Sequence, residues 1–235
     1  MRVIFILLYI VAFSYGKETL YIASASSMRY ALEEIVREFK KYKDFEVKLS
    51  WDASGSLYHK ILMGAPYHIF ISANKKYALL LKENGKGIYT ITMARGKLAV
   101  VSSHRINCEN LEDFLIKARK IVIANPKYAP YGISAISFLK KKKIYERIKN
   151  KLIFSANASH TLSTVISGSV DIGLTSLHIL KGKYIHFCTL KEEDYEPIEY
   201  TLVLLKGGKS ELFLEFLKSE TAKDILRKYG FEVLK

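Results

Sequence analysis

The sequence predicts an α/β fold with mixed, mostly parallel sheets flanked by helices, and two observations lead to this. Short apolar runs alternate with longer amphipathic runs from residue 20 onward, and strands that alternate with helices are typical of parallel βαβ units. The hydrophobic fraction of 49% excludes a disordered chain. A chain of 235 residues is long enough for one larger domain or two small ones.

The spacing of the apolar residues places each element in order. The first helix, for example, is expected at residues 28–41, where an apolar residue recurs every three or four positions. Strands are expected at residues 20–23, 47–51, 69–72, 98–102, 121–124, 152–154, 171–175, 185–189 and 198–205. Further helices are expected from about residue 57, at residues 75–83, 133–143 and 161–167, and twice at the C-terminal end, where Gly230 ends the last.

The first sixteen residues have the composition of a secretory signal peptide. Arg2 supplies the positive start, residues 3–13 form an uncharged apolar run, and the small residues Ser14 and Gly16 precede the expected cleavage near Gly16. The apolar run is shorter than the roughly 20 residues that a membrane-spanning helix needs. We therefore expect an exported protein in the periplasm or another extracytoplasmic compartment.

The net charge of +14 favours anions at long range. A nucleic-acid partner is not expected, because the lysines are scattered and no known binding module is present. Export permits a disulfide between Cys108 and Cys188, but the spacing cannot show that they meet, and buried free thiols are the interpretation that we favour. No Cys/His spacing indicates a directly bound metal.

Four loops between a predicted strand and a predicted helix are small and polar. Helix caps can explain each of them singly, but together they fall where α/β proteins bind ligands, at the carboxyl ends of strands. The backbone N–H groups at helix starts lack partners and form anion sites. Apart from Asp52 the loops carry almost no acid, which predicts an oxyanion site made of neutral donors. The loops comprise residues 25–27, 51–57, 124–134 and 155–162.

Several segments together resemble one family, the periplasmic molybdate- and tungstate-binding proteins that serve ABC importers. The segments are GSLYHKILMGAPYHIFISANKKYALLL, ALEEI with the serines before it, IANPKYAPYG, GSVDIGLTSL and KYGFEV. The resemblance covers residues 20–233. It implies the type II periplasmic-binding-protein fold, with lobe I at residues 17–92 plus 197–235, lobe II at residues 93–196, and the ligand in the cleft between them.

The resemblance also implies a ligand set, a partner and an assembly. An ABC permease is the implied partner, the protein is expected to be a monomer, and no cofactor is implied. In one branch of the family a tyrosine hydroxyl contacts the anion from the position of Ser176, so that contact is either lost here or made by a shorter hydroxyl. Tyr131 matches the other branch, in which the tyrosine stands in the Ala-Pro-Tyr-Gly loop. The implied oxyanion-binding residues are Ser26, Ser27, Ser54, Tyr131, Ala158 and Ser176.

Other functions remain open from the residues alone. Sulfate has the same charge as molybdate and differs mainly in size. Phosphate can carry a proton, so its receptors profit from a carboxylate acceptor, and Asp52 is the only nearby candidate. An exported acyl-transfer enzyme is a remote alternative, because Ser72 and Lys75 have the Ser-x-x-Lys spacing but the Lys-Thr-Gly and Ser-Asp-Asn companion motifs are missing. We therefore expect a binding protein and no catalytic residue.

Overall fold

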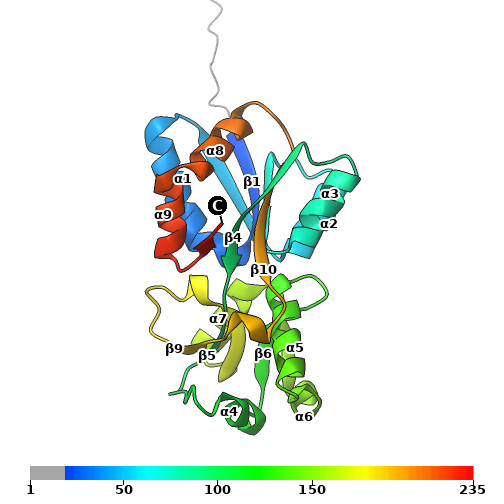
Figure 1. The fold of residues 1–235 in the computed structure, drawn as a ribbon, viewed down its shortest axis with the longest axis vertical. Coiled ribbons are helices and arrows are strands. Elements are labelled where there is room, and N and C mark those ends of the chain that lie inside the picture. Colours follow the sequence, from blue (N-terminus) through cyan, green and yellow to red (C-terminus); the bar gives the residue numbers. More distant parts are fainter. Residues whose placement is uncertain (1–18, 235) are drawn as a thin grey trace, which may run out of the picture.

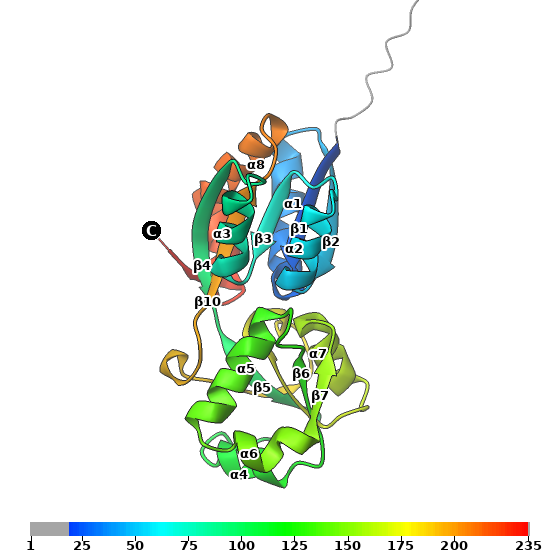
Figure 2. The ribbon, with the colours of Figure 1, turned by 90° about the vertical axis from the view of Figure 1, so that its right-hand side faces the viewer.

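The computed structural model describes residues 19–234, and the predicted signal peptide lies outside this range. Two sheets with flanking helices form an upper and a lower lobe (Figures 1 and 2). Within the described range no helix combines the length and the apolar character that a membrane span requires.

Lobe I contains a six-stranded sheet with the strand order β11-β4-β10-β3-β1-β2. Helices α1, α8 and α9 cover one face, and α2 and α3 cover the other (Figure 1). The strands are β1 (Thr19–Ala25), β2 (Glu46–Asp52), β3 (Ile69–Ser72), β4 (Tyr89–Gly96), β10 (Ile198–Leu204) and β11 (Glu232–Val233). The helices are α1 (Arg29–Tyr42), α2 (Ser54–Leu62), α3 (Lys75–Glu83), α8 (Lys209–Lys218) and α9 (Glu220–Lys228), and the short turn η1 (Ser26–Met28) precedes α1.

The alternation of side chains along β1 explains how this lobe packs on both faces. Leu20 and Ile22 belong to the core that contains the buried residues of α1, whereas Ala23 belongs to a second core with Leu57 and Phe70. All five side chains are 1% exposed or less. The sheet therefore buries both faces, as expected for strands that read as continuous apolar runs.

Lobe II contains a five-stranded sheet with the order β7-β6-β8-β5-β9. Helices α5 and α7 lie on either side of β6, and α4 and α6 lie at the end farthest from lobe I (Figure 1). The strands are β5 (Leu98–Ser102), β6 (Ile121–Ala124), β7 (Leu152–Ser155), β8 (Ile172–Ser176) and β9 (His186–Thr189). The helices are α4 (Leu111–Lys117), α5 (Pro130–Lys141), α6 (Tyr145–Ile148) and α7 (Ala158–Ile166), with short turns η2 (Lys149–Lys151), η3 (Leu177–Ile179) and η4 (Glu192–Asp194).

Both sheets are mixed, as predicted, although parallel pairing does not predominate. The described strands make four parallel pairings and five antiparallel ones. The antiparallel pairings arise because the chain passes between the lobes twice, once at Lys97 between β4 and β5 and once before β10. The pattern did not predict β4, whose side chains are mostly half-exposed and which depends on β10 and β11 for its pairing.

The favoured interpretation of the cysteines was wrong. Cys108 and Cys188 form a disulfide, with their Cα atoms 5.6 Å apart. The bridge ties the loop that follows β5 to the edge strand β9. The two residues are eighty positions apart, and only the antiparallel pairing of β9 with β5 brings them together.

Candidate functional site

A small cavity lies where the two lobes meet. Lobe I contributes the ends of β1 and β2 and the start of α2, and lobe II contributes the starts of α5 and α7. The carboxyl ends of strands and the starts of helices therefore face one another across the cleft, where open α/β sheets bind ligands. The lining residues are Ala25, Ser26, Ser27, Asp52, Ala53, Ser54, Ala73, Ala129, Pro130, Tyr131, Asn157 and Ala158.

Three α-helices begin at this cavity. Ser54 is the first residue of α2, Tyr131 is the second residue of α5, and Ala158 is the first residue of α7. The N–H groups of a first helical turn have no acceptor within the helix, and the helix dipole adds positive potential there. The cavity is therefore surrounded by backbone donors from both lobes.

Two serine hydroxyls at the cavity are already acceptors. Ser54 Oγ accepts a hydrogen bond from the Ala73 N–H at 3.0 Å, and Ser27 Oγ accepts one from the Tyr200 hydroxyl at 2.5 Å. A serine hydroxyl has one proton to donate, so each of these protons remains available to a ligand. Both serines are buried, which makes a ligand acceptor more valuable than it would be in water.

The cavity carries little charge. Of the described residues that line it, none is a lysine or arginine, and Asp52 is the only acid. The Asp52 carboxylate accepts from the Ala53 N–H at 2.8 Å and pairs with Lys60 at 2.9 Å. Each of the two carboxylate oxygens therefore already accepts one hydrogen bond.

The lobes touch directly around the cavity. The Gly55 N–H donates to the Tyr128 carbonyl at 2.8 Å, across the cleft from α2 to the loop before α5. Ser159 Oγ donates to the Ser26 carbonyl at 3.0 Å, and the Ser159 N–H donates to Ser26 Oγ at 3.4 Å. In this arrangement the two lobes are closed over the cavity.

The structure brings together five of the six residues that the resemblance implies. Ser26, Ser27, Ser54, Tyr131 and Ala158 all line the cavity. Ser176 is fully buried but does not line it, and its hydroxyl instead donates to the Tyr131 hydroxyl at 3.0 Å.

Two participants were not found from the sequence. Tyr200 lies in β10 between Glu199 and Thr201, and none of the motifs identified in the sequence includes it. Ser159 stands in a loop that was singled out, but its contact with Ser26 depends on the closed arrangement of the lobes. The start of α7 at residue 158, three residues earlier than expected, would have indicated Ser159 as a residue of the first helical turn.

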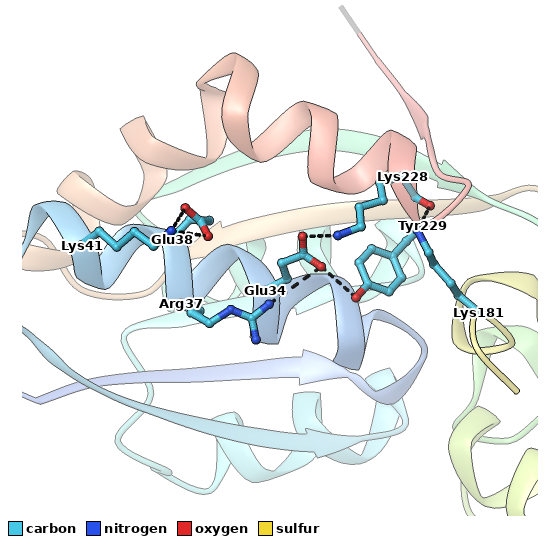
Figure 3. Close-up of polar contacts among 7 residues, drawn as sticks. All are labelled: Glu34, Arg37, Glu38, Lys41, Lys181, Lys228 and Tyr229. Atoms are coloured by element: carbon cyan, nitrogen blue, oxygen red, sulfur yellow. Dashed lines mark hydrogen bonds and ion pairs between the residues drawn. The ribbon is translucent and has the colours of Figure 1, made fainter.

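A second contact between the lobes lies at the C-terminal end of α9 (Figure 3). There Glu34 of α1 accepts hydrogen bonds from the Lys228 ammonium at 2.5 Å and the Tyr229 hydroxyl at 2.9 Å. The Lys228 hydrogen bond, more than any other contact, lowers the pKa of Glu34. From lobe II, Lys181 donates to the Lys228 carbonyl at 2.9 Å, so a cation meets the negative end of the helix.

His178 of lobe II joins the same contact from its buried side. Its Nδ1 lies 3.0 Å from the Tyr229 carbonyl, and its Nε2 accepts from the Lys97 N–H at 2.8 Å, at the crossing between the lobes. Because Nε2 is an acceptor, Nδ1 carries the proton and donates. The ring stacks on Phe231 with 3.7 Å between centroids, and burial lowers the pKa of His178 to about 4. His178 is therefore neutral at physiological pH.

Comparison with known proteins connects this geometry to a family. A family model described as bacterial extracellular solute-binding protein matches residues 20–232. The chain belongs to this family. It is therefore a solute-binding protein and not an enzyme.

Individual relatives of this solute-binding protein agree with that assignment. It is 30% identical over 217 residues to the molybdate-binding protein ModA of Rhodobacter capsulatus, a match that covers 89% of this chain and 86% of the relative. The periplasmic molybdate-binding protein of Azotobacter vinelandii superimposes with a TM-score of 0.85 at 25% identity, covering 92% of this chain and all of that one. The substrate-binding domain of a putative molybdenum ABC transporter from Clostridium difficile gives a TM-score of 0.68 at 25% identity, with 93% and 100% covered.

Ser72, the serine of the Ser-x-x-Lys spacing, forms hydrogen bonds within a turn of this solute-binding protein. Ser72 Oγ donates to the Asn74 carbonyl at 2.7 Å and accepts from the Asn74 N–H at 3.0 Å, at the turn that leads into α3. Its side chain is fully buried. Among residues 19–234 no group of three or more His, Cys, Asp and Glu side chains is arranged to hold a metal ion.

Proposed function

We propose that this solute-binding protein captures molybdate or tungstate and delivers it to the permease of an ABC importer. Its similarity to known proteins supports this, since two of these relatives are molybdate-binding proteins and one belongs to a putative molybdenum ABC transporter. The export signal expected at residues 1–16 agrees with capture outside the cytoplasm.

The observation that carries the proposal is the donor set of the cavity. Three helix starts, the turn at Ser26 and Ser27 and two hydroxyl protons converge on one small space, while the nearest acid is already paired. Burying a dianion is costly unless most of its oxygens find donors. Neutral donors from both lobes meet that demand without a lysine or arginine, and hydrogen bonds to charged acceptors are the stronger ones.

The proposed ligands are Ser26, Ser27, Ser54, Tyr131 and Ala158. The serines act through hydroxyl and N–H groups, whereas Tyr131 and Ala158 offer backbone N–H groups from lobe II. Ser176 has a supporting role through the Tyr131 hydroxyl. The proposed lobes are residues 17–92 with 197–235 and residues 93–196, and closure of a monomer around the ion encloses it.

Sulfate is the second candidate, because it presents the same charge and tetrahedral shape to the same donors. Phosphate is a further candidate, for which Asp52 is the one acid among the described lining residues, and each of its oxygens already accepts one hydrogen bond. Molybdate and tungstate are nearly the same size, so we propose no preference between them.

Calorimetric titration of the signal-free protein with molybdate, tungstate, sulfate and phosphate tests the proposal. We expect submicromolar binding of molybdate and tungstate, about −8 kcal/mol or stronger, and no comparable binding of the other two. Tight sulfate binding without molybdate binding would overturn the choice of ligand.

The placement of the site has its own test. Ser27→Ala and Ser54→Ala should each weaken molybdate binding by roughly 1–3 kcal/mol, the range for a lost hydrogen bond to a buried charge. Unchanged affinity in both variants would mean that the anion binds elsewhere.

A further inference from the structure

Four hydroxyl groups form a continuous chain behind the cavity. Ser176 Oγ lies 3.0 Å from the Tyr131 hydroxyl, which lies 3.0 Å from the Tyr200 hydroxyl, which in turn lies 2.5 Å from Ser27 Oγ. All four side chains are at most 2% exposed. Ser176 and Tyr131 belong to lobe II, whereas Ser27 and Tyr200 of β10 belong to lobe I.

The direction of this chain follows from counting protons. The His178 N–H donates to Ser176 Oγ at 3.2 Å, and a backbone N–H can only donate. The geometry has Tyr200 donating to Ser27 Oγ and Ser176 donating to the Tyr131 hydroxyl. Each hydroxyl has one proton, and that of Tyr200 is used at Ser27, so Tyr131 donates to Tyr200. Burial raises the pKa of both tyrosines, so both remain protonated donors at physiological pH.

We propose that Tyr200 is a positioning residue for anion capture, because its donation to Ser27 Oγ leaves the Ser27 proton directed into the cavity. The inference rests on the proposed function, in which Ser27 is a ligand. It adds a coupling between closure and affinity. In this arrangement Tyr131 of lobe II donates to Tyr200 of lobe I, so in this proposal closure supports the orientation of the Tyr200 hydroxyl toward Ser27.

The first test is a double-mutant cycle with Tyr200→Phe and Ser27→Ala. The anion is whichever of molybdate, tungstate, sulfate and phosphate the wild-type protein binds most tightly. Tyr200→Phe keeps the ring, which packs edge-on against Phe231 at 5.0 Å, and removes the hydroxyl. We expect about tenfold weaker binding in the wild-type background and no further loss in the Ser27→Ala background, because Tyr200 acts through Ser27.

Tyr195→Phe is the matched control. The Tyr195 hydroxyl is also buried and accepts from the Leu98 N–H at 3.2 Å near the crossing between the lobes, but it is not part of the chain. This variant is expected to keep wild-type affinity. Equal losses from Tyr200→Phe in both Ser27 backgrounds, or an equal loss from Tyr195→Phe, would indicate general packing at the crossing and would overturn the proposal.

Neutron diffraction from deuterated crystals of the wild-type protein tests the direction of the chain without any added anion. We expect a deuteron on the Tyr200 oxygen that points to Ser27 Oγ. A deuteron on Ser27 that points to Tyr200 would overturn the proposal even if molybdate binds. Absence of binding by all four anions would instead overturn the proposed function, and the diffraction result would still decide the direction.

Discussion

The two contacts between the lobes have opposite polarity. At the cavity, the positive starts of α2, α5 and α7 face one another, with hydroxyl protons that have no protein acceptor. At the outer contact, the negative end of α9 meets Lys181 and His178 from lobe II, and both partners are satisfied by the protein itself.

This difference indicates how closure depends on the ligand. Closing the cavity without an anion brings like helix ends together and leaves buried donors unpaired, which is unfavourable. The outer contact forms without any ligand and is partly exposed to solvent. We therefore expect anion binding at the cavity to determine whether the lobes close. The outer contact should shift the equilibrium between open and closed lobes only slightly.

The largest effect is expected from reversing the polarity of the cavity. Ser54→Asp places a carboxylate at the start of α2 beside the proposed dianion, and like charges in a buried site cost several kcal/mol. Molybdate binding should weaken by about 100-fold or more, as measured by calorimetry. Ser56→Asp on the same helix, outside the cavity lining, is the control and should bind normally. An affinity of Ser54→Asp close to that of the wild type would show that the cavity is not an anion site.

His178, at the outer contact, makes the free energy of unfolding depend on pH. Its pKa is lowered from 6.5 to about 4 in the folded protein, so the unfolded chain binds a proton between these values and the folded protein does not. The contribution of His178 to the free energy of unfolding is therefore fully present above pH 6.5. It decreases as the pH falls toward 4, by about 3 kcal/mol in total.

Denaturant unfolding between pH 4 and 7 measures this effect. His178→Gln is the comparison, because a glutamine side chain at this position does not titrate. The slope of the unfolding free energy against pH should be smaller in the variant. Identical slopes in the two proteins would contradict the assignment of a buried neutral imidazole.

Gly55 tests how closely the lobes must approach at the cavity. A Cβ at this position would lie 2.6 Å from the Tyr77 hydroxyl and 2.9 Å from the Tyr128 carbonyl of the other lobe. The tyrosine side chain can move, but the carbonyl is backbone, so Gly55→Ala should hold the cleft slightly open. We expect about tenfold weaker molybdate binding, roughly the 1.4 kcal/mol of one lost closing contact. Ser56→Ala is the control, and equal affinities would mean that closure does not need this approach.

The smallest effect is expected at the exposed side of the outer contact. Lys181→Met removes the donor to the Lys228 carbonyl, and exposed charge interactions contribute about 0–1 kcal/mol. Molybdate affinity should fall by about fivefold at most, and the difference should diminish at high salt. Lys120→Met, a substitution of an exposed lysine that precedes β6, provides the comparison. A loss larger than that of Ser54→Ala would reverse the ranking of the two contacts.

The sequence pattern predicted the fold class and most element interiors but misplaced the helix starts that matter most. Helices α2, α5 and α7 each begin three residues before the expected position, at Ser54, Pro130 and Ala158. The apolar period becomes visible only where a helix packs on its sheet, and the first turns of these helices face the cleft with small side chains. The loops that the sequence marked as polar are therefore partly the first helical turns of the site.

By itself, the sequence determined the alternation of strands and helices, the neutral character of the polar loops and the resemblance to a family of oxyanion receptors. These follow from local composition, because a buried helix face and a buried strand each require a characteristic spacing of apolar residues along the chain. The tertiary structure alone decided the disulfide, the β4 pairing, the place of Ser176 behind Tyr131 and the contact of Tyr200 with Ser27. Each of these joins residues far apart in the chain, so local composition cannot predict the distance between them.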